Sequence, residues 1–441
     1  MKTINVGICG LGTVGSGVVN VMQRNVAAIA ARAGREVSIT HIGARRDNPA
    51  CDVGAAKVSR DIFAVVNDPD VDIVIELIGG YEPALELVMQ AIANGKHVVT
   101  ANKALIAMHG NEIFAAAEKQ GVSVLFEAAV AGGIPIIKAM REGLAANSIE
   151  WLAGIINGTG NYILTEMRDK GRQFDDVLVD AQQLGYAEAD PTFDVEGIDA
   201  AHKLVILASL AFAMPLNFDA CFTEGISAIA PQDVVFAGEL GYRIKHLGIA
   251  RKTEQGVEMR VHPTLIPQRR LIANVDGVMN AVLVKGDAVG PTLYYGPGAG
   301  AEPTASSVIA DVVDVVRTID AAPASRVPAL GVAQASLSAL PVLSISDINT
   351  AYYLRINVSD QPGVLSHITQ VLSDFGISIE AVLQKEAVQQ EVSAAASSRQ
   401  VPIVLITDRT LESKFMAAVE RIEALDAVQE SIHFIRVESL G

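Results

Sequence analysis

The sequence predicts an α/β and α+β chain: an N-terminal domain with a parallel sheet, a mixed-sheet domain, and a small ferredoxin-like domain at the C-terminus. Three observations predict this fold class. A Gly-x-Gly-x-x-Gly turn lies between an apolar strand and a helix near the N-terminus. A very apolar helical stretch, 198–213, follows a group of carboxylates. The segment from 350 onward has the element order βαββαβ.

The composition is typical of a globular enzyme, because 50% of the 441 residues are hydrophobic and only 19% are charged. The longest apolar runs are too short to span a bilayer, and the N-terminus enters a strand instead of a signal peptide. We therefore expect a cytoplasmic protein without a membrane partner. The formal net charge of -16 argues against a nucleic-acid partner. The three cysteines and eight histidines lack metal-ligand spacing, which argues against a transition-metal enzyme.

The N-terminal domain, 1–135, begins with a strand expected at 3–9 and the glycine-rich turn after it. In a Rossmann fold the first glycine permits a tight turn, the second lets a pyrophosphate approach the backbone, and the third lets helix and strand pack. The helix N-terminus then donates N–H groups to the anion. The residues of this predicted dinucleotide site are Gly10, Gly12, Thr13, Val14 and Gly15. The alternative is a glycine turn of purely structural use.

The end of the second strand, expected at 37–44, bears on the choice of cofactor. An acidic residue there would bind the ribose 2′-hydroxyl of NAD, but the sequence has Arg45 and Arg46. Arginine can bind a 2′-phosphate, so NADP is favoured over NAD, and Lys57 could assist on the same phosphate. A solvated pair of arginines on a loop is the alternative.

Further strands at 71–78, 97–100 and 122–126 complete a doubly wound sheet. Lys103 lies beyond a carboxyl end, where it can bind the substrate or the nicotinamide end of the cofactor; a surface lysine is the alternative. The double glycine and proline that follow Glu127 mark the end of the domain. This bend exposes carbonyl oxygens that, with Glu127, could bind a hard monovalent cation, and a plain hinge explains the pattern equally well.

The middle domain, 136–320, is expected to begin with a helix to about 146 and a strand at 150–156. The loop Asn157-Gly158-Thr159, before a helix at 162–168, suits an amino-acid ligand or an ordinary N-cap. Further expected elements are strands at 258–263, 278–285 and 293–295, a glycine-rich stretch at 296–305 that would let a cofactor approach the backbone, and a helix at 306–320 that returns to the N-terminal domain and completes it.

Asp199 and Lys203 are the predicted catalytic pair. They lie four residues apart on the apolar helix, so both side chains project from one face. An ordinary ion pair on a solvated face is the alternative, but the flanking residues leave little room for such a face. A lysine beside a carboxylate can keep its proton and deliver it, which is general-acid chemistry. Glu188, Asp190 and Asp194 would line the same cleft and suggest a ligand with an amino group.

The C-terminal domain, 350–441, follows a linker at 321–349 that is rich in Ala, Pro and Ser. Its expected elements are a strand at 351–359, a helix at 364–375, strands at 377–385 and 401–407, a helix at 411–425 and a strand at 428–437. We expect this ferredoxin-like unit to be a separate domain without a catalytic constellation. A polar gap, 386–400, interrupts it.

These segments together resemble the monofunctional homoserine dehydrogenases that carry a C-terminal ACT domain, over the whole chain. The segments that carry the resemblance are Gly10-Leu11-Gly12-Thr13-Val14-Gly15, Thr100-Ala101-Asn102-Lys103, Asn157-Gly158-Thr159, Gly185-Tyr186-Ala187-Glu188-Ala189-Asp190-Pro191, Gly197-Ile198-Asp199-Ala200-Ala201-His202-Lys203 and Gly298-Ala299-Gly300. Asp360-Gln361-Pro362-Gly363-Val364-Leu365 is similar to the turn of ACT domains, which bind amino acids at domain interfaces.

The resemblance implies reversible reduction of L-aspartate 4-semialdehyde to L-homoserine with NAD(P)H, on the route to threonine, methionine and isoleucine. Lys203 would be the proton donor, and Lys103 would contact substrate and cofactor. The implied substrate-binding residues are Glu188, Asp194, Asp199, Thr159 and Gly158. Further implied cofactor contacts are Thr100, Gly185, Gly300 and Glu302. A sodium or potassium ion would be bound by Glu127, Val130, Gly132 and Ile134.

The same resemblance makes L-threonine a possible effector at the ACT domain, although the polar gap could disturb that pocket. A mixed sheet with much apolar surface and an ACT domain that usually pairs make a homodimer or homotetramer the default. The rival enzyme class is aspartate-semialdehyde dehydrogenase, which needs a cysteine nucleophile. The rival from another class is a non-catalytic sensor of dinucleotide and amino acid, which would not need Asp199 and Lys203 together.

Overall fold

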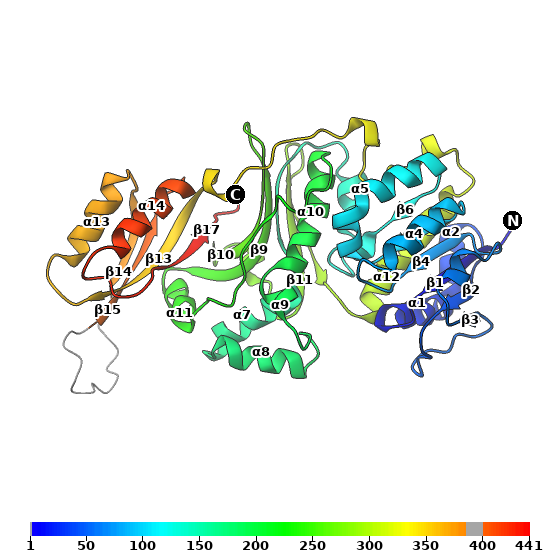
Figure 1. The fold of residues 1–441 in the computed structure, drawn as a ribbon, viewed down its shortest axis with the longest axis horizontal. Helices are drawn as coiled ribbons and strands as arrows, with labels where there is room; N and C mark the ends of the chain where they lie inside the picture. Colours follow the sequence, from blue (N-terminus) through cyan, green and yellow to red (C-terminus); the bar gives the residue numbers. More distant parts are fainter. Residues whose placement is uncertain (1, 385–399) are drawn as a thin grey trace.

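The computed structural model describes residues 2–384 and 400–441, and Figure 1 shows its parts arranged along the longest axis. A parallel sheet with helices on both faces forms the N-terminal end. A mixed sheet lies in the middle and continues to the opposite end, where two further helices cover it (Figure 1). The predicted fold class is therefore confirmed. No helix in the described ranges is both long and apolar enough to cross a bilayer.

The N-terminal sheet has six parallel strands in the order β3-β2-β1-β4-β5-β6, which is the Rossmann order. The strands are β1 (Ile4–Cys9), β2 (Val37–Gly43), β3 (Lys57–Ser59), β4 (Ile73–Glu76), β5 (His97–Thr100) and β6 (Val124–Leu125). The helices that cover them are α1 (Thr13–Arg24), α2 (Val26–Ala33), α3 (Phe63–Val66), α4 (Ala84–Ala93), α5 (Lys103–Gln120) and α12 (Ala301–Thr318). Ile73 and Ile75 of β4 pack with α1, α2 and α12, whereas Val74 packs with α4 and α5.

Glycines permit the close approaches in this unit. Gly10 has a φ of +107°, and a Cβ on Gly15 would lie 2.1 Å from the carbonyl oxygen of Gly10. A Cβ on Gly17 would lie 2.5 Å from the carbonyl oxygen of Ala301, so α12 packs directly on α1. The helix α12 starts at Ala301 and not at 306 as expected. Pro303 does not prevent the earlier start, because it lies in the first turn, where an N–H is not needed.

The second sheet has eleven strands, nine of them in the order β12-β11-β7-β9-β10-β17-β13-β15-β14. Its strands from the middle of the chain are β7 (Ile149–Ile155), β8 (Phe222–Thr223), β9 (Tyr242–Lys252), β10 (Val257–Pro267), β11 (Met279–Gly286) and β12 (Gly290–Pro297). The helices there are α6 (Ile136–Lys138), α7 (Gly158–Lys170), α8 (Phe174–Gln183), α9 (Thr192–Val195), α10 (Ile198–Phe212) and α11 (Pro231–Glu239). The helix expected to reach about 146 is shorter, since a π-helical turn, η2 (Ala139–Gly143), follows α6.

The sequence did not predict β9. Its Lys245 and His246 are buried, and these polar residues interrupt the apolar pattern of the strand. Lys245 is accommodated because its Nζ lies 2.6 Å from the carbonyl oxygen of Val275 and 3.0 Å from Asp276 Oδ1. A partner so far along the chain gives no local signal.

The C-terminal unit has the ferredoxin-like strand order β17-β13-β15-β14, with its two helices on one face. Its elements are β13 (Asn349–Ser359), α13 (Val364–Asp374), β14 (Ile379–Gln384), β15 (Gln400–Thr407), β16 (Thr410–Leu411), α14 (Glu412–Glu423) and β17 (His433–Val437). The expected boundaries agree except for the last strand, which starts at His433 and not at 428. The predicted polar gap lies outside the described residues, apart from Gln400.

This unit was expected to be separate, but its sheet continues the middle sheet. β17 pairs with β10 in parallel, Thr264 opposite Arg436 and Leu265 opposite Val437. Buried charges cross the junction: Arg260 Nη2 contacts Glu438 of the C-terminal unit and also lies 3.1 Å from Glu258. The two units thus share one hydrogen-bonded sheet.

More ion pairs join the two units beside the sheet. Arg436 of β17 binds Glu224 of the middle unit at 2.8 Å, while Glu412 of its own unit holds it at 2.5 Å. Arg355 of β13 lies 2.6 Å from Asp233 of α11. Such ion pairs fix the relative orientation of the units, because separating the partners would leave a buried charge without a counter-charge.

Candidate active site

The helix α10 places both predicted catalytic residues in its first two turns. Gly197 precedes the helix with a φ of +84°, and a Cβ there would lie 3.1 Å from His246 and Val261. The start of α10 therefore lies directly on the middle sheet. Only 5% of the Asp199 side chain and 11% of the Lys203 side chain are exposed, so this is not an ion pair on a solvated face.

Asp199 lies between two lysine ammonium groups. Lys203 Nζ donates to Asp199 Oδ2 at 2.6 Å and to the carbonyl oxygen of Ile156 at 2.7 Å. Lys103 Nζ lies 3.1 Å from Asp199 Oδ1 and comes from the other unit, at the start of α5. Its side chain is 37% exposed, so this lysine closes the group on its open side.

The charges of this group set its protonation. Burial works to raise the pKa of Asp199, but the charges of Lys203 and Lys103 outweigh burial and hold that pKa well below its usual range. Burial lowers the pKa of Lys203, and the charge of Asp199 offsets this only in part. The charge of Asp199 raises the pKa of Lys103. Lys203 is therefore the lysine that releases its proton more readily.

Asn157 joins two of the carboxylates. Its Nδ2 donates to Asp194 Oδ1 at 2.8 Å and to Asp199 Oδ2 at 2.9 Å, while its Oδ1 accepts from the N–H of Gly160 at 2.7 Å. The sequence suggested a ligand site or an N-cap for this loop, and the side chain caps α7 while it also bridges two acids. Burial raises the pKa of Asp194, and the hydrogen bond from Asn157 counteracts it.

The other predicted substrate residues surround this group. Thr159 donates its hydroxyl to the carbonyl oxygen of Tyr186 at 2.5 Å, so its side chain holds the loop that carries Glu188. Glu188 is exposed, and after Asp199 it also contributes to raising the pKa of Lys103. A Cβ at Gly158 would lie 2.7 Å from a carbonyl oxygen, so the close approach of the backbone there requires glycine. Asp190 is exposed and binds Thr192 at 2.7 Å. The charges of Asp199, Asp194 and Glu188 all act on Lys103, so these three acids lie near it, whereas Asp190 contacts Thr192 instead.

A cavity of about 800 Å³ opens between the glycine-rich turn and the end of β2. Its lining includes Gly10, Gly12, Arg45, Arg46 and Arg60. Gly12 has nothing within 4 Å of its Cβ position and precedes α1 without a side-chain cap, so N–H groups of the first turn, at Thr13 and Val14, are presented to an anion. The cavity therefore fits a dinucleotide phosphate.

The arginines of this cavity differ in their contacts. Arg45 and Arg46 are exposed, and neither has a hydrogen bond or ion pair within the described part of the chain. Arg60 was not predicted; it binds Asp47 at 2.8 Å and the carbonyl oxygen of Ala44 at 3.1 Å. Its only signal was a basic residue directly after a short strand. Lys57 lies on β3, exposed and outside the lining of the cavity.

The remaining predicted cofactor residues are placed less simply. Thr100 was expected to contact the cofactor, but its side chain is fully buried and donates to Glu76 at 2.5 Å. Its hydroxyl is therefore not available to a cofactor. Glu302 is bound by Arg24 at 2.7 Å on the surface. Gly185 and Gly300 have φ values of +75° and +118°, so both loops depend on glycine.

The predicted cation-binding bend contains oxygens that already accept hydrogen bonds. Glu127 accepts from the N–H groups of Ile137 and Lys138, at 2.9 and 2.7 Å. The carbonyl oxygen of Gly132 accepts from Ser307 at 2.7 Å, and that of Ile134 accepts from Ile136 at 2.8 Å. Each of these oxygens keeps a second lone pair, so with the carbonyl of Val130 the set fits an oxygen-bound monovalent cation. In residues 2–384 and 400–441 no group of three His, Cys, Asp or Glu suits a metal ion.

The sequence indicated no separate role for His202, which lies on α10 between Asp199 and Lys203 and packs beside the site. Its ring stacks on Phe218 with centroids 4.4 Å apart and on Phe193 at 5.3 Å. Its Nε2 lies 3.4 Å from the hydroxyl of Tyr81, which belongs to the Rossmann unit. Aromatic contacts between such distant segments leave no pattern in the sequence.

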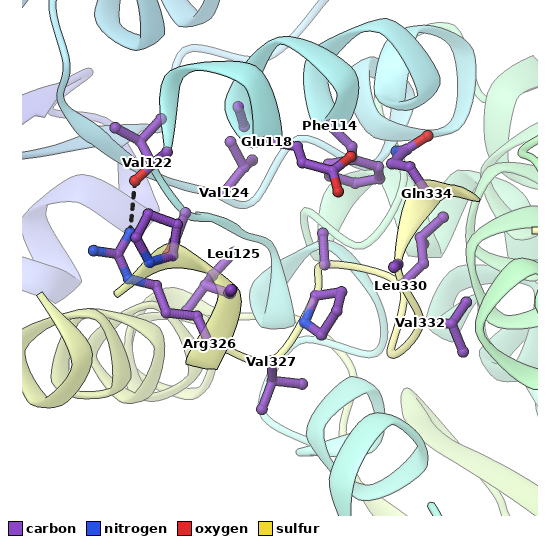
Figure 2. Close-up of a pocket in the computed structure, with 18 of the residues that line it drawn as sticks. Phe114, Glu118, Val122, Val124, Leu125, Arg326, Val327, Leu330, Val332 and Gln334 are labelled. Atoms are coloured by element: carbon purple, nitrogen blue, oxygen red, sulfur yellow. Dashed lines mark hydrogen bonds between the residues drawn. The ribbon is translucent and has the colours of Figure 1, made fainter. Parts of the chain in front are cut away.

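A second cavity, of about 430 Å³, lies between the end of α5, β6 and the linker, as Figure 2 shows. Its lining is mostly apolar, with Phe114, Val124 and Leu330 among the residues labelled there. Arg326 points along its edge and donates to the carbonyl oxygens of residues 121, 318, 319 and 321. None of the predicted site residues lines it.

The Rossmann cavity and the buried lysine group together define an NAD(P)-dependent oxidoreductase. The chain matches the family model described as homoserine dehydrogenase over residues 135–313 and the NAD-binding domain of homoserine dehydrogenase over 10–127. An ACT domain matches over 352–424. The chain belongs to the homoserine dehydrogenase family.

Relatives support this over the full length. The chain is 62% identical to the homoserine dehydrogenase of Pseudomonas aeruginosa and 53% identical to that of Neisseria gonorrhoeae, in each case with 100% of both chains covered. It is similar to the crystal structure of a homoserine dehydrogenase from Thiobacillus denitrificans, with a TM-score of 0.94, 60% identity, and 100% of this chain and 99% of that chain covered. A hyperthermophilic archaeal homoserine dehydrogenase in complex with NADPH matches 71% of this chain and 97% of its own, with a TM-score of 0.59 and 25% identity.

Proposed function

We propose that the protein catalyses the reversible NAD(P)H-dependent reduction of L-aspartate 4-semialdehyde to L-homoserine. The observation that carries this proposal is the buried group in which Asp199 binds Lys203 at 2.6 Å and Lys103 at 3.1 Å. Lys103 follows β5, at the carboxyl edge of the sheet where the cavity beside the glycine-rich turn also opens. Lys103, and through Asp199 the proposed proton donor Lys203, would thus lie at the same edge as the dinucleotide site, as an aldehyde reductase requires.

The roles follow from the charges. A bound nicotinamide dinucleotide supplies or accepts the hydride. During reduction, negative charge develops on the carbonyl oxygen, and the ammonium of Lys203 stabilises that charge and donates the proton. Because burial lowers its pKa, Lys203 releases the proton more easily than an exposed lysine. In the reverse direction its neutral amine accepts the proton of the hydroxyl, while Lys103 remains a cation that contacts substrate and cofactor.

The acids bind the amino group of the substrate in this proposal. Glu188, Asp194 and Asp199 present carboxylates beside the lysines, and the loop of Gly158 and Thr159 borders them. An ammonium group of the ligand would compensate the surplus of negative charge.

We propose NADP as the preferred cofactor and NAD as the second one. Arg45 and Arg46 are exposed in the cavity without partners in the described structure, so they are available to a 2′-phosphate, with Lys57 as a weaker assistant. The phosphates would lie on Gly10, Gly12, Thr13, Val14 and Gly15, with Thr100 (through its backbone), Lys103, Gly185, Gly300 and Glu302 as further contacts. The NADPH bound by the archaeal relative supports this choice.

The proposal extends to ions, effectors and assembly. A sodium or potassium ion would be bound by Glu127, Val130, Gly132 and Ile134, and L-threonine would act through the ACT domain. The protein would be a cytoplasmic homodimer or homotetramer in threonine, methionine and isoleucine biosynthesis. The chain would divide into 1–135 with the helix expected at 306–320 and observed as α12 (Ala301–Thr318), 136–320, a linker at 321–349, and 350–441.

The test is absorbance at the reduced-nicotinamide band, with L-homoserine and NADP or NAD, each with and without L-threonine. Reduction of the cofactor is the expected result, faster with NADP. Absence of reduction in protein that binds NADPH would favour the sensor. The rival that needs a cysteine nucleophile is disfavoured by the structure: burial raises the pKa of Cys221 to about 12, and that of the fully buried Cys9 further still.

A further inference from the structure

The side-chain amide of Asn157 makes all its hydrogen bonds within the site. It follows β7, precedes α7, and is 6% exposed. An N-cap needs only an acceptor, which Oδ1 provides to the N–H of Gly160 at 2.7 Å. Both remaining donors of the amide go to carboxylates, Asp194 Oδ1 at 2.8 Å and Asp199 Oδ2 at 2.9 Å. The second pair of contacts is not explained by helix capping.

Asp194 and Asp199 repel each other, and their counter-charges are unequal. Asp199 has two lysines within 3.1 Å, whereas the only side-chain hydrogen bond to Asp194 in the described structure comes from Asn157. A neutral amide with two donors is the group that can hold two ionised acids together without adding a charge. A lysine in its place would compete with the ammonium group of a ligand.

We infer that Asn157 is a positioning residue that holds Asp194 and Asp199 side by side as a two-carboxylate receptor for the ammonium group of the substrate. This inference rests on the proposed function. It assigns Asn157 to substrate affinity more than to proton transfer, because Lys203 keeps its own contacts with Asp199 and with the carbonyl oxygen of Ile156.

The test compares Asn157→Asp with Asn157→Ser. Both variants keep an oxygen that can cap α7, so both should fold, and thermal unfolding checks this. Asn157→Asp replaces the two amide donors by a third carboxylate. We expect the KM for L-homoserine to rise about tenfold or more, with a smaller change in kcat, because a hydrogen bond to a charged group is lost and repulsion is added.

The pH profile separates positioning from capping. In Asn157→Asp the acidic limb of kcat/KM should move to higher pH, since Asp194 loses its donor and gains a like charge; Asn157→Ser should raise KM with a smaller shift of that limb. Wild-type KM and pH profile in both variants, with active wild-type protein, would overturn the inference alone. Wild-type protein that does not oxidise L-homoserine would overturn the proposed function, and the inference with it.

Discussion

Replacing Lys203 by methionine removes the proton donor while keeping most of the side chain's length. Its ammonium is the group held by Asp199 and by the carbonyl oxygen of Ile156. After the change, Asp199 still has Lys103 at 3.1 Å and the amide of Asn157 at 2.9 Å. The carboxylate is therefore not left as an isolated buried charge, and the variant should fold.

The loss of turnover follows from the role of the ammonium. A positioned general acid contributes about 10²- to 10⁴-fold to a rate, which is about 3–5 kcal/mol of activation free energy. We therefore expect kcat to fall by at least about two orders of magnitude in both directions. Cofactor affinity should change little, because Lys203 does not line the dinucleotide cavity.

The assay is steady-state turnover followed at the reduced-nicotinamide band, together with fluorescence titration of NADPH. Lys245→Met is the matched control: Lys245 is also buried and also bound to an aspartate and a carbonyl oxygen, at 3.0 and 2.6 Å, but it is not one of the predicted site residues. The control should lose stability and keep its turnover per folded molecule. Normal turnover with weakened NADPH binding in Lys203→Met would refute the assignment.

Three further predictions concern other parts of the molecule. Arg45→Ala should raise the Kd for NADPH about tenfold and leave that for NADH nearly unchanged, as fluorescence titration can show; equal effects on both cofactors would contradict a 2′-phosphate contact. Glu438→Gln should lower the free energy of unfolding by about 1.5–3 kcal/mol in urea titrations, because buried Arg260 loses one charged partner and keeps Glu258 at 3.1 Å, and a loss under about 0.5 kcal/mol would speak against a coupled junction. Burial lowers the pKa of His202 and of His246 from the ordinary 6.5 to about 4. As the pH falls, the unfolded chain therefore binds protons at these two histidines before the folded chain does. Each histidine contributes about 3 kcal/mol to the free energy of unfolding above about pH 6.5, and this contribution is lost as the pH falls toward about 4. Melting temperature against pH should show that limb, and His202→Phe should flatten it.

Local signals were enough for the elements that carry the dinucleotide site. The turn from Gly10 to Gly15 depends on backbone conformation and close packing, both of which restrict residue type at fixed spacing. The pair Asp199 and Lys203 was predictable because i and i+4 positions meet on any helix. In each case the partners are close in sequence.

The sequence did not give the contacts that depend on distant partners. The bridge from Asn157 to two acids joins residues 37 and 42 positions apart, and Arg60 reaches the cavity only through the pairing of β3 with β2. Strand β9 was missed because a buried lysine looks like a surface residue until its acceptors are known. The surface position of Glu302 and the buried hydroxyl of Thr100 likewise follow from neighbours on other elements.

The long strand β10 would be an aggregation hazard without its neighbours, because every one of its residues is buried and its free edge would offer unpaired backbone groups to other chains. Three short segments from separate parts of the chain cover that edge. Val342 bridges to Val257, β8 pairs with residues 260 and 261, and β17 pairs with residues 264 and 265. The ACT unit therefore also protects the strand from self-association, and a chain cut before 350 would have to cover this edge in another way to stay in solution.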